Sequence, residues 1–120
     1  MMNMHLKKAL LIGLSFLSLN AYSDTAASKE ALALQCRQLA DTVASLVYSQ
    51  EKKACVEKLA LAAMQIEDAA DFILDDAYPP AKLELDHAVY TLQYAELNSC
   101  NRYIQISHSK FEAQKLKNSL

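Results

Sequence analysis

Glycine is almost absent from this chain. Its 120 residues include one glycine, Gly13, two prolines, Pro79 and Pro80, and no tryptophan. Glycine is the usual residue of tight hairpins, and glycine-rich loops hold phosphate groups in nucleotide-binding sites. The sequence after residue 13 therefore argues against a hairpin-rich β fold and against a phosphate-binding loop.

Basic charge is also scarce. Twelve Lys and Arg stand against fourteen Asp and Glu, for a formal net charge of −2. Nucleic-acid-binding domains present a strongly basic surface. We therefore expect no nucleic-acid partner.

The first 23 residues resemble a secretory signal peptide. Lys7 and Lys8 precede a mostly apolar run over residues 9–19, and Ala21 and Ser23 are the small residues of a cleavage site. A membrane-spanning helix needs about 20 apolar residues, so an uncleaved anchor is the weaker alternative. Removal of residues 1–23 would take away two lysines and no acid, leaving one domain over residues 24–120 with a net charge of −4. We expect it to be secreted or periplasmic, without a membrane span.

Helix-forming residues fill the remaining sequence. A first helix is predicted over residues 28–48 and a second over 51–76, although one continuous helix over 28–76 is an alternative. Their apolar seams step by three and four residues: Leu32, Cys36, Leu39, Val43 and Leu46, then Cys55, Leu59, Ala62, Ile66, Ala69 and Ile73. A third helix beyond the prolines carries the seam Leu85, Ala88, Leu92 and Ala95. A short last helix is predicted from Ser109, which forms a capping-box pattern with Glu112.

Pro79 and Pro80 divide the second helix from the third. The residue before a proline is disfavoured in the helical region, and proline lacks the backbone donor, although it fits the first turn of a helix. We therefore predict an all-α fold: a small bundle of three main helices, with an antiparallel hairpin about Pro79-Pro80, and a short C-terminal helix.

The hairpin predicts which cysteines pair. If it turns near Tyr78, residues of the two helices lie level when their numbers sum to about 155, as Cys55 and Cys100 do. Cys36 would lie level with residue 63, about 12 Å along the axis from Cys55 and beyond the roughly 7 Å allowed between bridged Cα atoms. We predict a Cys55–Cys100 disulfide, with Cys36 a buried thiol or, alternatively, an intermolecular or redox-labile one.

Acidic residues gather before the prolines. Asp68, Asp71, Asp75 and Asp76 form a candidate acidic docking patch. A cation site built from Asp75, Asp76 and His87 is chemically conceivable, but no known ligand spacing is present, so we predict no metal and no cofactor. Ser107, His108 and Ser109 lack a neighbouring acid or oxyanion hole, and we predict no catalytic residue.

A second apolar surface lies on the back of the predicted hairpin. The same register aligns residues of both helices into one strip: Leu61, Met64, Phe72, Leu83, Tyr90, Tyr94 and Leu97. We expect either internal cover, from the first helix or from the C-terminal segment with Tyr103, Ile104, Ile106 and Phe111, or a partner. Internal cover is the slightly favoured alternative.

These patterns indicate a non-catalytic interaction or assembly subunit of a cell-envelope complex, which binds other envelope proteins or itself. The leading alternative is a periplasmic carrier that binds a metal or small ligand inside the bundle. A secreted effector or inhibitor of another protein is a third possibility.

Overall fold

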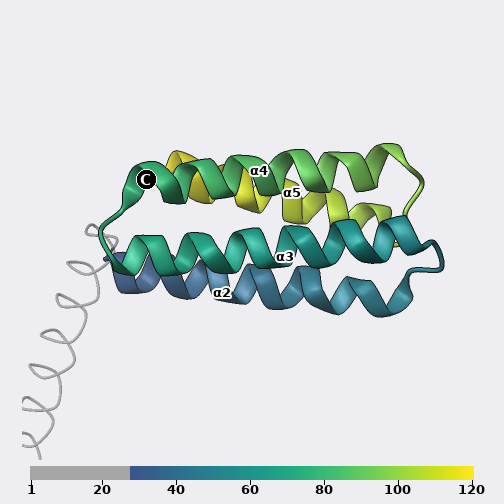
Figure 1. The fold of residues 1–120 in the computed structure, drawn as a ribbon, viewed down its shortest axis with the longest axis horizontal. Coiled ribbons are helices and arrows are strands. Elements are labelled where there is room, and N and C mark those ends of the chain that lie inside the picture. The colour runs from purple at the N-terminus through teal and green to yellow at the C-terminus, as the bar shows by residue number, and fades with distance from the viewer. Residues whose placement is uncertain (1–27) are drawn as a thin grey trace, which may run out of the picture.

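The computed structural model describes residues 28–120, and the expected signal peptide and its cleavage site lie outside them. Four α-helices follow one another: α2 (Lys29–Ser45), α3 (Lys53–Leu74), α4 (Tyr78–Leu97) and α5 (Tyr103–Asn118), with a 3-10 turn, η1 (Leu46–Ser49), after α2. The helices run alternately up and down, with α2 beside α3 and α5 beside α4 (Figure 1). The predicted all-α bundle is confirmed.

The first two helices are separate, as predicted. Ser28 caps α2, because its hydroxyl accepts a hydrogen bond from the Ala31 amide at 3.2 Å. The last turn tightens into η1 and the chain becomes extended at Gln50, before α3 begins at Lys53. The alternative of one continuous helix over residues 28–76 is therefore wrong.

The third helix begins before the prolines, not beyond them. α4 starts at Tyr78, so Pro79 and Pro80 occupy its first turn, where backbone N–H groups have no partner within the helix. The preceding bend contains Asp76 at φ 59°, a conformation that glycine would ordinarily supply. The hairpin thus turns where predicted, but within fewer residues.

The last helix is longer than predicted. α5 starts at Tyr103, six residues before Ser109, and follows Arg102 in the left-handed region at φ 68°. The capping box of Ser109 and Glu112 is wrong, because Ser109 is buried in the interior of the helix. The bundle consequently has four full helices.

The predicted seams form the core. Every residue of the three seams is buried, and α5 completes the interior with four more side chains: Ile106, Ser109, Ala113 and Leu116. Alanine is frequent on the inner faces of α3 and α4, which lets these two helices approach closely.

The predicted disulfide is present. Cys55 and Cys100 are bonded, with their Cα atoms 5.6 Å apart, and they join α3 to the segment just after α4. Cys36 is a buried free thiol in the α2 seam. No helix within residues 28–120 is both long and apolar enough to cross a membrane.

Candidate functional site

The predicted apolar strip lies on the outer face of the α3–α4 hairpin. Seven residues make up this surface, which we call the outer strip: Leu61, Met64, Phe72, Leu83, Tyr90, Tyr94 and Leu97. Five of them are exposed, led by Leu97 at 75% and Tyr90 at 65%. Leu61 and Phe72 are half-buried, and Phe72 packs against the core. The outer strip therefore combines two half-buried residues with five whose side chains are exposed to solvent.

The outer strip is uncovered because both remaining helices pack on the other side of the hairpin. α2 lies against α3, and α5 lies against α4 (Figure 1). The C-terminal segment does not cover it either: Ile106 points into the core, whereas Tyr103, Ile104 and Phe111 are exposed on α5. The favoured expectation of internal cover is wrong for the described residues.

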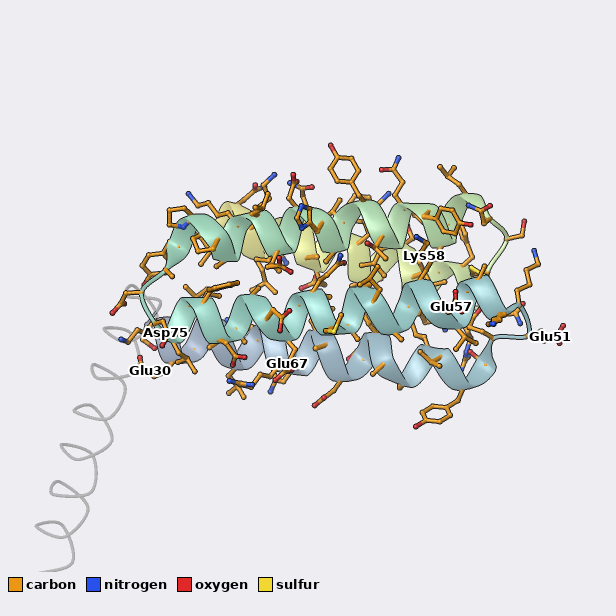
Figure 2. All side chains as sticks on the ribbon, viewed as in Figure 1. Glu30, Glu51, Glu57, Lys58, Glu67 and Asp75 are labelled. Atoms are coloured by element: carbon orange, nitrogen blue, oxygen red, sulfur yellow. A yellow bond between two sulfur atoms is a disulfide. The ribbon has the colours of Figure 1, made fainter. Side chains whose placement is uncertain are left out.

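Two polar contacts hold the hairpin in register beside the outer strip. The Thr91 hydroxyl donates a hydrogen bond to Gln65 Oε1 at 3.0 Å, between α3 and α4. The Lys58 ammonium lies 4.8 Å from the centre of the Tyr94 ring, and Figure 2 shows Lys58 reaching towards the space between these helices. This contact places a cation over the face of Tyr94, an attraction worth about 0.5–1 kcal/mol at an exposed site.

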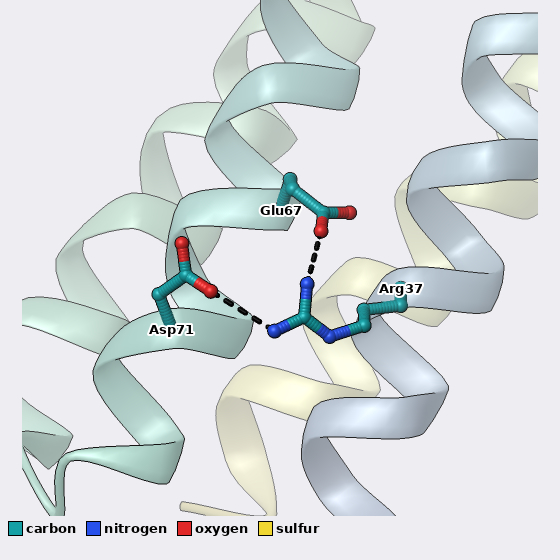
Figure 3. A network of polar contacts seen from close by, with 3 residues as sticks. All are labelled: Arg37, Glu67 and Asp71. Atoms are coloured by element: carbon teal, nitrogen blue, oxygen red, sulfur yellow. Dashed lines mark hydrogen bonds and ion pairs between the residues drawn. The ribbon is translucent and has the colours of Figure 1, made fainter.

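The predicted acidic patch is partly neutralised within the molecule. Arg37 of α2 donates hydrogen bonds to both Glu67 and Asp71 of α3 (Figure 3). Hydrogen bonding to Asp71, with the nearby Glu67 charge, raises the pKa of the Arg37 guanidinium. Lys29 reaches Asp76 at 3.2 Å. These pairs bind α2 to α3, so Asp71 and Asp76 have a structural role.

Asp68 and Asp75 remain as the outward carboxylates of the patch. Both are exposed, and neither takes part in an ion pair within residues 28–120. Asp75 lies at the end of the bundle where α3 turns into α4 (Figure 2). Of the four carboxylates predicted to form the patch, two are therefore paired with basic side chains and two remain unpaired within residues 28–120.

The conceivable cation site is not assembled. Asp76 pairs with Lys29, and His87 Nδ1 lies 3.7 Å from Glu84 Oε1. Across the described part of the chain, no three His, Cys, Asp or Glu side chains are grouped closely enough to hold a metal ion.

The sequence did not predict that polar residues of α2 and α5 face each other. They line a groove between these two helices: Gln35, Gln38, Thr42, His108, Ser109 and Glu112. The one available signal was Ser109, which lies on the apolar face of α5 three residues after Ile106. The capping-box interpretation placed Ser109 at the start of a helix, so its position on the apolar face was not recognised.

Searches against protein-family models, characterised proteins and solved structures found no match to this chain.

Proposed function

We propose that this protein is a non-catalytic interaction or assembly subunit that works in the periplasm or outside the cell, as part of a cell-envelope complex. The observation that carries the proposal is the outer strip, with five large apolar side chains exposed along two adjacent helices. Single exposed apolar residues are ordinary on protein surfaces, whereas aligned sets of this kind are typical of binding surfaces.

The composition of the strip also fits an interface. Its members include two tyrosines, a methionine and a phenylalanine, all of them residue types enriched at protein interfaces. Asp68 lies on the same face of α3, one helical turn from both Met64 and Phe72, so the apolar surface on α3 is interrupted by one carboxylate. The half-buried Leu61 and Phe72 would form the floor on which partner side chains rest.

Charge favours a particular partner. Asp68 lies between Met64 and Phe72 along α3, Asp75 follows one turn after Phe72, and the chain as a whole is acidic. Complementary charges at the margin of an interface accelerate association and select the orientation of the partner. We therefore expect a partner segment, most simply a helix, with an apolar ridge flanked by lysine or arginine.

The proposed compartment rests on two features. The sequence of residues 1–23 has the pattern of a signal peptide, and Cys55 and Cys100 are joined in a disulfide, which persists in oxidising compartments. Cell fractionation and N-terminal sequencing of the purified protein test this part, with Asp24 expected as the first residue. A protein that keeps residues 1–23 in the cytoplasm would contradict it.

Site-specific photo-crosslinking in the source cell tests the interaction. A photoreactive phenylalanine analogue at Tyr90 should give a discrete crosslinked product, and the same analogue at Tyr48, which is exposed on η1 away from the strip, should not. The product should disappear when Leu97→Asp is added. Equal crosslinking at Tyr48 and Tyr90, or none at Tyr90, would contradict the proposal.

A further inference from the structure

A second exposed apolar surface lies on α5. Ile104 is 77% exposed and Phe111 is 65% exposed. They are seven residues apart and therefore share one face of the helix, and Lys115, four residues after Phe111, lies on the same face. We call these three residues the α5 ridge. Its composition, two apolar side chains followed by a lysine, matches the chemistry expected of a partner of the outer strip.

The α5 ridge cannot reach the outer strip of its own molecule. α5 packs on the other side of the α3–α4 hairpin, and the ridge is on its solvent face (Figure 1). Any contact between the ridge and the strip therefore joins two copies of the chain.

The spacing of the apolar residues is the same on both surfaces. Tyr90 and Leu97, both exposed members of the outer strip, are seven residues apart on α4, as Ile104 and Phe111 are on α5. At a rise of 1.5 Å per residue, each pair spans about 10.5 Å. An α5 helix that lies antiparallel to α4 on the strip therefore brings Phe111 level with Tyr90 and Ile104 level with Leu97.

Charge is complementary in this register. Met64 of α3 is level with Tyr90, because the Gln65–Thr91 hydrogen bond and the disulfide set the alignment of the two helices. Asp68 lies one turn beyond Met64 towards the prolines, and Lys115 lies one turn beyond Phe111 in the same direction. The lysine of the docked copy thus meets a carboxylate that takes part in no ion pair within residues 28–120.

The reverse direction is disfavoured by charge. If α5 of the second copy ran parallel to α4, Ile104 would lie level with Leu83, and Lys115 would lie level with Tyr94. That ring already has the Lys58 ammonium 4.8 Å from its centre. Two lysines would then be placed together, and like charges in contact oppose association.

We propose that the outer strip binds the α5 ridge of a second copy of this chain, so that successive copies stack in an open row. The inference rests on the proposed function and names the partner. α5 runs parallel to α3 within one bundle, so a docked copy points in the same direction as the copy that receives it (Figure 1). Each added copy presents a free ridge on one side and a free strip on the other, and the row does not close at two copies.

Mixing two disabled variants tests the contact. Leu97→Asp disables the strip and Phe111→Asp disables the ridge, and both side chains are exposed, so the fold should be kept. In analytical ultracentrifugation the parent should exceed twice the mass of one chain as its concentration rises towards about 1 mM. Each variant alone should stay monomeric, and an equimolar mixture should form a one-to-one complex and grow no further. Tyr48→Asp, at a site outside both surfaces, should associate like the parent.

Three results would overturn the proposal. They are a parent that stays monomeric up to about 1 mM, a mixture that forms no complex, and a Phe111→Asp variant that associates as well as the parent, which would mean that two strips face each other. A monomeric parent that still crosslinks through Tyr90 to a different protein in the cell would overturn the row alone and leave the proposed function standing.

A charge exchange tests the register. Lys115→Glu should weaken self-association by about fivefold or more, because it sets an acid against Asp68 of the neighbouring copy. Asp68→Lys in the same chain should restore association, and urea unfolding of each variant checks that the fold is unchanged. An effect of Lys115→Glu that Asp68→Lys does not reverse would overturn the assigned register and the proposal with it.

Discussion

The Lys110 ammonium lies 2.7 Å from Glu96 Oε1, and the Glu96 side chain is only 8% exposed although α4 and α5 both border solvent. This ion pair is largely withdrawn from water, because the Lys110 side chain is itself only 24% exposed. It holds the middle of α5 against the last turn of α4.

Removing Lys110 should destabilise the bundle. Lys110→Met leaves the Glu96 carboxylate largely buried without its partner, so the free energy of unfolding should fall by about 2 kcal/mol in urea titrations. Lys53→Met is the matched control, because Lys53 is 90% exposed and lies 3.9 Å from Glu57, and exposed pairs contribute about 0–1 kcal/mol. Equal effects of the two variants would show that burial of the Glu96 pair does not matter.

The disulfide should contribute most of the measurable stability of so small a domain. Cys55 and Cys100 are 45 residues apart, and closing a loop of that length contributes about 4 kcal/mol in the chain-entropy account. The double variant Cys55→Ala/Cys100→Ala should lose about that amount in urea unfolding. Reduction of the parent protein should produce the same loss, whereas reduction of the double variant should produce none.

Arg102 offers a stabilising substitution. It precedes α5 at φ 68°, and a residue with a Cβ atom pays about 1–2 kcal/mol for this conformation, whereas glycine adopts it readily. Arg102→Gly should raise the free energy of unfolding by about 0.5–1 kcal/mol, after the greater freedom of glycine in the unfolded chain is subtracted. Arg102→Ala, which keeps Cβ, should give no such gain, and a gain from alanine would place the effect in the arginine side chain.

Cys36 should make the protein less stable at alkaline pH. Burial, with a smaller effect of the Glu67 charge, raises the pKa of the Cys36 thiol from its ordinary 9.0 to about 11. Between these values the unfolded thiol loses its proton while the folded one keeps it, so the unfolded state binds fewer protons and stability falls as pH rises. The loss should reach roughly 2 kcal/mol at pH 11.

Comparison with Cys36→Ala isolates this effect from the titration of tyrosines and lysines. The difference in unfolding free energy between parent and variant should be constant below pH 9 and should shift in favour of the variant above it. A difference that stays constant to pH 11 would show that the thiol ionises equally well in the folded state.

The hairpin and its register could be predicted because the determinants are local and strong. Two prolines mark one turn, and the helical rise then determines which residues of the two helices lie level, including Cys55 and Cys100. The buried seams followed from spacing alone. Five members of the predicted strip are exposed as the register predicts, whereas Leu61 and Phe72 are half-buried, and the role of the strip as a binding surface stays a prediction.

The start of α5 could not be predicted, because Arg102 gives no capping signal. Its left-handed conformation, which glycine or asparagine would ordinarily reveal, follows directly on Asn101, whose backbone is held by long-range contacts. Gln50 provides two of these: its Oε1 accepts from the Asn101 amide at 2.8 Å, and its Nε2 donates to the Asn101 carbonyl at 2.8 Å. Such a contact between residues 51 positions apart has no sequence pattern.

The side of the hairpin on which α5 packs could not be predicted either, for a related reason. Whether α5 covers the outer strip or completes the core depends on which side of the hairpin the chain takes after Cys100. Ile106 lies inside and Ile104 outside although both are equally apolar, and the ion pairs of Lys110 and Lys117 that fasten α5 to α4 have no sequence pattern.

The disulfide makes a closed covalent ring of the α3–α4 hairpin, and both outer helices are attached at its cysteine end. A protease that cuts the exposed bend at Asp75-Asp76 would therefore not divide the molecule. The two fragments, one carrying α2 and α3 and the other carrying α4 and α5, would stay together until the protein is reduced. In a compartment rich in proteases, a nicked chain of this design keeps its four helices within one molecule.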